Sequence, residues 1–115
     1  MFKIEHFDEV TVIGNLNGKP DELQRAIEKS LQEEKDLVID LEGTDIGSSC
    51  LGKIVCGYVE AQRKGGTIKL AGIPSRVKDL LMITNLDGNF EVFKTKDQAI
   101  ASFNSNGNGR KVLRV

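Results

Sequence analysis

Gly47-Ser48-Ser49-Cys50-Leu51-Gly52 lies near the middle of the 115-residue chain, between two segments with different patterns. The segment before it, residues 36–41, is a short apolar run that predicts a buried strand. The segment after it, residues 51–63, has apolar residues at helical spacing and predicts a helix. A helix N-terminus presents unpaired backbone N–H groups and a partial positive charge. The serines therefore either cap the helix or include a phosphorylated residue, and spacing alone favours the cap.

Strands and helices alternate on both sides of this stretch. Further strands are expected over residues 2–7, 10–13, 67–71 and 90–93, and further helices over residues 20–32, 77–84 and 96–103. Ser75 is expected to cap the second of these helices. After the initial pair of strands, this order predicts an α/β fold with a largely parallel sheet. One core is expected to contain Leu37, Ile39, Leu51, Ile54, Val55, Leu70, Val77 and Leu81.

Composition narrows the possible functions. A chain of this length is expected to form one domain, here residues 1–103, followed by a flexible tail over residues 104–115. The formal net charge of −1, the absence of Trp and the single Tyr argue against binding to nucleic acid. No apolar run reaches the roughly 18 residues that a membrane span requires.

Reactive side chains are few. His6 is the only histidine and is expected to be an exposed strand residue, and the cysteines fit no zinc pattern. We therefore expect no metal, no cofactor and no catalytic residue. Cys50 and Cys56 are expected to remain free thiols, because six residues along a helix separate them by about 9 Å along its axis. Free thiols without an export signal predict a cytoplasmic protein.

Residues 47–53 also fit the phosphate-loop pattern G-x-x-x-x-G-K. The next position, which would supply a hydroxyl to magnesium, is Ile54, and Leu51 is needed in the apolar stripe of the helix. We therefore expect a helix here rather than a phosphate-binding loop. An enzyme is the third interpretation of the chain, after two kinds of protein-binding module.

The central stretch and its preceding strand resemble the STAS domain, the family of bacterial anti-sigma factor antagonists, whose loop reads Asp-Ser-Ser/Thr/Ala-Gly-Leu-Gly. Gly14-Asn15-Leu16-Asn17 is similar to the family's Gly-X-Leu/Ile-Asp, and residues 73–87 resemble its second short helix and the adjoining turn. The resemblance covers about residues 11–103. It implies a STAS-like α/β fold, with a mixed sheet of about four to five strands and about four helices packed against it.

The resemblance also implies a mechanism called partner switching. The unphosphorylated antagonist binds an anti-sigma factor that is also a serine kinase, and this binding frees a sigma factor for transcription. Phosphorylation of a serine ends the binding, and a serine phosphatase restores it. Carried over by position, the phosphorylated residue is Ser48, with Ser49 as the second candidate.

The same resemblance implies that the partner binds around these serines. Gly47 stands where the family has an acidic residue, Cys50 where it has glycine, and Asn17 where it has Asp. The alternative function is a constitutive binding or scaffold STAS module, such as a subunit of a transporter or signalling complex, in which the serines only cap the helix. The residues expected to contact the partner are Asn17, Asp45, Gly47, Cys50, Leu51 and Gly52.

Overall fold

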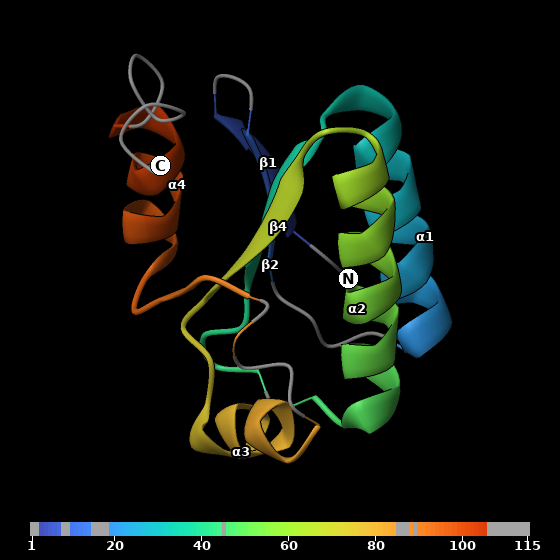
Figure 1. Ribbon diagram of the computed structural model, residues 1–115, viewed down its shortest axis with the longest axis vertical. Helices are drawn as coiled ribbons and strands as arrows, with labels where there is room; N and C mark the ends of the chain where they lie inside the picture. Colours follow the sequence, from blue (N-terminus) through green and yellow to red (C-terminus); the bar gives the residue numbers. More distant parts are fainter. Residues whose placement is uncertain are drawn as a thin grey trace.

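Figure 1 shows the computed structural model, which describes residues 3–7, 10–14, 19–44, 46–84, 88 and 90–105. Within these residues five strands and four helices alternate as predicted. They are β1 (Lys3–Phe7), β2 (Val10–Gly14), α1 (Pro20–Glu33), β3 (Asp36–Asp40), α2 (Ser48–Arg63), β4 (Thr67–Ala71), α3 (Ser75–Ile83), β5 (Val92–Phe93) and α4 (Lys96–Ser105).

The five strands form one mixed sheet in the order β1-β2-β3-β4-β5. Only β1 runs antiparallel to its neighbour β2, and every other pair is parallel. Ile13, Ile39 and Leu70 stand side by side across the three central strands. The predicted mixed and largely parallel sheet is confirmed.

Helices cover both faces of the sheet, as Figure 1 shows. Helices α1 and α2 pack together on one face, α4 lies on the other, and α3 lies beyond one end of the central strands. Side chains of β3 alternate between the two layers, because successive residues of a strand point to opposite faces. Leu37 and Ile39 pack beneath α1 and α2, whereas Val38 packs beneath α4. A central strand apolar on both faces is therefore confirmed.

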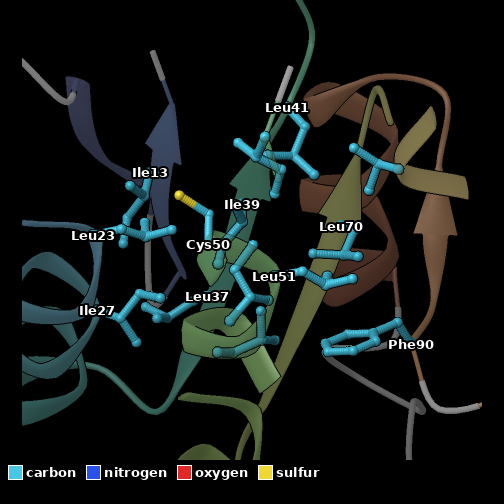
Figure 2. Packing of buried hydrophobic residues seen from close by; sticks show 14 of the residues in the cluster. Ile13, Leu23, Ile27, Leu37, Ile39, Leu41, Cys50, Leu51, Leu70 and Phe90 are labelled. Atoms are coloured by element: carbon cyan, nitrogen blue, oxygen red, sulfur yellow. The ribbon is translucent and has the colours of Figure 1, made fainter. Parts of the chain in front are cut away.

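The larger core lies between the sheet and helices α1, α2 and α3 (Figure 2). It contains all the residues predicted to share one core, with Val55 partly buried at its edge. Phe90 was expected to begin the last strand, but it packs into this core ahead of β5. Its ring lies 4.7 Å, centre to centre, from that of Tyr58 on α2.

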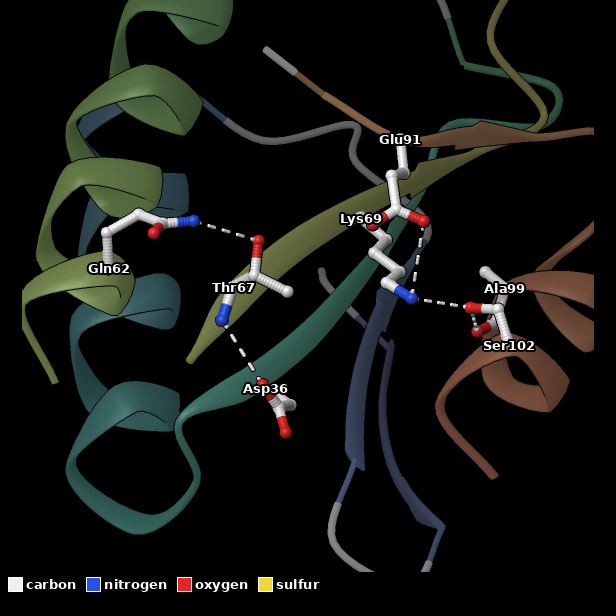
Figure 3. A network of polar contacts seen from close by, with 7 residues as sticks. All are labelled: Asp36, Gln62, Thr67, Lys69, Glu91, Ala99 and Ser102. Atoms are coloured by element: carbon white, nitrogen blue, oxygen red, sulfur yellow. Dashed lines mark hydrogen bonds and ion pairs between the residues drawn. The ribbon is translucent and has the colours of Figure 1, made fainter. Parts of the chain in front are cut away.

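The smaller core lies beneath α4 and includes one buried cation, Lys69 (Figure 3). The Lys69 ammonium donates to the Ser102 hydroxyl of α4 (2.7 Å) and lies 3.5 Å from a Glu91 carboxylate oxygen. It also lies 4.1 Å from the centre of the Phe103 ring. A buried charge of this kind needs such partners, because removal from water is costly.

An ion pair between β1 and α4 adds to this packing. Lys96 donates a hydrogen bond of 3.0 Å to Glu5. This bond holds the pKa of Glu5 below its usual value and raises the pKa of Lys96. Helix α4 continues to Ser105, two residues beyond the expected end of the domain, and the remainder of the predicted tail lies outside the described residues.

Gly66 allows α2 to turn tightly into β4. The predicted glycine cap is confirmed: Gly65 has a φ of 85°, and the Gly66 N–H donates to the Ala61 carbonyl (2.8 Å). A Cβ on Gly66 would lie only 1.9 Å from the carbonyl oxygen of Lys35. The backbone before β3 therefore occupies the space that any other side chain would need.

Replacing Ile39 by alanine should lower the free energy of unfolding by about 2–5 kcal/mol, because it removes a fully buried side chain from the central strand. Urea melts would measure the loss. A change below about 1 kcal/mol would contradict the central position of β3.

Replacing Gly66 by alanine should lower the free energy of unfolding by about 2–3 kcal/mol, because backbone has to move to accept the Cβ. Gly52→Ala is the control, since no atom lies within 4 Å of its Cβ position. It should raise stability by roughly 0.5–1 kcal/mol, as alanine replaces glycine within a helix. Equal thermal shifts for the two variants would count against the close approach at Gly66.

Candidate functional site

The loop between β3 and α2 places both serines at the surface. Its backbone is held by hydrogen bonds from the Leu41 N–H to the Ala71 carbonyl (2.9 Å) and from the Thr44 N–H to the Leu41 carbonyl (3.0 Å). The side chains of Leu41, Thr44 and Ile46 are buried. Because the loop is anchored at these three buried residues, it holds the first turn of α2 in a defined position.

The prediction that a serine caps α2 is wrong. The N-cap is Gly47, which has extended backbone angles (φ −93°, ψ −174°), and no side chain caps the helix. Ser48 and Ser49 are already the first two helical residues, and both are exposed. A capping hydroxyl has to come from the residue before the helix, so neither serine can serve this purpose. Ser75 differs from expectation in the same way, because the N-cap of α3 is Pro74.

The first turn of α2 offers an environment suited to an anion. The first hydrogen bond of the helix runs from the Leu51 N–H to the Gly47 carbonyl (3.1 Å), so the N–H groups of Ser48, Ser49 and Cys50 precede the helical ladder. No acidic residue lies in this turn. Backbone N–H groups and the helix dipole both favour negative charge here.

Cys50 and Leu51, both expected to contact the partner, instead face the core. Their exposed fractions are 9% and 3%, and both belong to the larger core cluster (Figure 2). Burial raises the pKa of the Cys50 thiol, which makes it a poor nucleophile. We therefore correct the expectation for these two side chains: they position the helix and leave the surface to their neighbours. Cys50 and Cys56 are free thiols, as predicted.

Gly47 and Gly52 are the exposed members of the expected contact set. No atom lies within 4 Å of the Cβ position of either glycine. The backbone of the first two turns of α2 is thus accessible beside the serines. Asn17 and Asp45, the other two residues expected to contact the partner, lie outside the described residues.

The lysine of the phosphate-loop pattern lies within α2. Lys53 is separated from the serines by a full helical turn, and its ammonium lies 3.9 Å from an Asp21 carboxylate oxygen on α1. Ile54, at the position where a hydroxyl would bind magnesium, is fully buried. The expected helix is confirmed, and helical backbone cannot wrap around a phosphate as an open glycine-rich loop does.

Two other polar contacts involve residues that could carry chemistry. His6 shares a hydrogen bond of 3.0 Å with the Thr11 hydroxyl, and it is exposed on β1 as expected. The Ser102 hydroxyl donates to the Ala99 carbonyl (2.7 Å) and accepts from Lys69 (Figure 3). Glu91 and the Phe103 ring lie beside the Lys69 ammonium, so its contacts serve to pack α4 against the sheet. The sequence contains one sign of this contact, a lysine within the apolar strand β4.

The described ranges contain no group of three or more His, Cys, Asp or Glu residues placed to hold a metal ion. None of the helices in these ranges combines the length and apolar character needed to cross a bilayer.

Comparison with known proteins identifies one family. A sequence model of the STAS domain matches residues 10–99. A solved anti-sigma-factor antagonist (STAS) domain protein from Planctomyces limnophilus has a TM-score of 0.78 and 21% identity, over 88% of this chain and 96% of that one. No curated protein matches the chain.

Two structures of the anti-sigma factor antagonist SpoIIAA share the fold as well. The unphosphorylated form has a TM-score of 0.75 and 19% identity, over 93% of this chain and 97% of that one. The phosphorylated form, described as a Bacillus cell fate determinant, has a TM-score of 0.72 and 18% identity, over 88% and 97%. Because these solved structures are only 18–21% identical to this chain, their similarity shows a shared fold and nothing more.

The chain should not bind ATP or GTP in a magnesium-dependent manner, because residues 48–53 are helical and Ile54 offers no hydroxyl. Calorimetry with each nucleotide and magnesium would test this. Micromolar affinity that Lys53→Ala abolishes would contradict the expectation and would favour an enzyme.

Proposed function

Because this chain belongs to the STAS domain family, we propose that it is an anti-sigma factor antagonist that acts by partner switching in the cytoplasm. In its unphosphorylated form it binds an anti-sigma factor that is also a serine kinase, which releases a sigma factor. Phosphorylation of Ser48 ends the binding, and a serine phosphatase reverses the modification. Ser49 is the second candidate for phosphorylation.

The observation that carries this proposal is the position of Ser48 at the start of α2. Its hydroxyl is exposed and is not used to cap the helix. A serine that capped the helix would lose a stabilising hydrogen bond on modification. Ser48 can therefore accept a phosphate without losing a capping bond.

The same position accommodates the phosphate once it is attached. A phosphoserine carries about −1.5 to −2 charges at neutral pH. The N–H groups that precede the α2 ladder and the helix dipole stabilise this charge, and no carboxylate of the first turn opposes it. We therefore expect the modification to leave the fold intact and to change only the surface.

The partner surface that we propose is a small area around the serines, and the first turn of α2 contributes no acidic side chain to it. Gly47 and Gly52 leave their backbone open to close approach, with Asn17 and Asp45 as further contacts. Cys50 and Leu51 support this area from the core. A phosphate placed in such a contact introduces charge where the partner would otherwise exclude water, which commonly costs a large part of the affinity.

A second function, a constitutive binding or scaffold module, is favoured by Gly47. The family places an acidic residue at this position, next to the serine that is modified, and here that residue is a glycine. In this function the exposed start of α2 still binds a partner, but no kinase acts on it.

Ser48→Asp should weaken binding to the anti-sigma factor kinase by at least about tenfold, which corresponds to about 1.4 kcal/mol. Its melting temperature should stay nearly unchanged, because the added charge lies at a helix N-terminus. Ser48→Ala should bind normally and resist phosphorylation. Calorimetry with a purified anti-sigma factor kinase and thermal melts of each variant would measure these effects.

Ser75→Asp provides a matched control for that experiment. Ser75 is likewise exposed and is the first residue of a helix without acidic residues in its first turn. The control should melt like Ser48→Asp but bind the kinase with normal affinity. If the kinase phosphorylates neither Ser48 nor Ser49, the switch is refuted and the scaffold function takes its place.

A further inference from the structure

A cavity of about 580 Å³ lies between α3 and β5, within the described part of the chain. Its walls are largely apolar and include Ile73, Met82, Phe90 and Val92. Met82 and Val92 remain 55% and 41% exposed, so the core leaves apolar surface open here. Cavities of 300–1,000 Å³ with apolar walls are typical of sites for small molecules.

The charged side chains described at this cavity are positive. Lys78 of α3 and Lys94, which comes directly after β5, both line it, and the described lining residues include no Asp or Glu. Neither ammonium group forms an ion pair with a described residue. Glu91, three residues before Lys94, lies 3.5 Å from Lys69 instead. An apolar cavity with two cations at its walls is complementary to a molecule with an apolar body and one negative group.

We propose that this cavity binds a small amphiphilic carboxylate, with its hydrocarbon part against Ile73, Met82 and Phe90 and its carboxylate between Lys78 and Lys94. The site is separate from the serines at the start of α2 and does not depend on the function proposed above. Phe90 connects it to the rest of the molecule, since Phe90 lines the cavity and its ring packs against Tyr58 of α2.

Tyr58 makes the proposal directly measurable. It is the only tyrosine, and the chain has no tryptophan, so tyrosine fluorescence reports on this one residue. Decanoate is the probe, titrated below micelle formation, with 1-decanol and decyltrimethylammonium as neutral and cationic analogues. We expect a saturable change in Tyr58 fluorescence with half-saturation between roughly 0.1 and 1 mM, as ligands of this size allow. Calorimetry should give one decanoate per chain.

Two variants test the role of charge. Lys78→Ala combined with Lys94→Ala should weaken decanoate at least about tenfold and leave decanol unchanged. Val92→Glu should weaken decanoate similarly by placing a like charge at the cavity wall. Arg25→Ala combined with Lys29→Ala, two exposed cations of α1, is the control with the same loss of charge and should bind decanoate normally.

The outcomes are distinguishable. Equal affinity for decanoate and decanol would overturn the carboxylate site, and so would normal decanoate binding by the double lysine variant. Absence of saturation, or several bound decanoates per chain, would show only nonspecific adsorption and would also overturn it. Because both lysines are exposed, we expect the double lysine variant to keep its fold. Melting curves of each variant would verify this.

Discussion

Burial of β3 on both faces is the constraint on which the rest of the structure depends. Residues 36–39 are all buried, with α1 and α2 over one face and α4 over the other. Since β2, β3 and β4 are parallel, their carboxyl ends meet at one edge of the sheet. The loops from β3 and β4 therefore emerge at the same edge, and in Figure 1 helix α3 and the start of α2 both lie at the lower end of the sheet. Both the exposed serines and the apolar cavity lie at this edge of the sheet.

On the α4 face, Lys69 adds polar contacts to the apolar packing of the smaller core. Its stem lies in the core, and its ammonium lies beside the Glu91 carboxylate and the Ser102 hydroxyl of α4 (Figure 3). The ring of Phe103, the next residue of α4, completes these contacts. Removal of one partner would leave a buried charge only partly compensated, which is more costly than the loss of an ordinary contact. The contacts of Lys69 and the ion pair between Glu5 and Lys96 both stabilise the packing of α4 on the sheet.

The two proposed sites use opposite physical chemistry. The start of α2 is uncharged and favours an added anion through its backbone and dipole, so a covalent phosphate can change the surface without disturbing the core. The cavity beside α3 is apolar and attracts an anion through two lysine side chains. Phe90, which lines the cavity, packs against Tyr58 of α2, the helix that carries the serines.

Sequence pattern alone was sufficient for the order of elements, the central strand and the principal core, because these depend on hydrophobic period and on Gly and Pro at the element ends. It was also sufficient for the family and for Ser48 as the candidate. The start of α2 required the tertiary structure: burial of Thr44 and Ile46 sets where the loop ends, which makes Gly47 the N-cap and frees both serines. Inward packing of Cys50 and Leu51 was decided in the same way. The partners of Lys69 and the walls of the cavity come from segments far apart in the chain, and only the folded sheet brings such segments together.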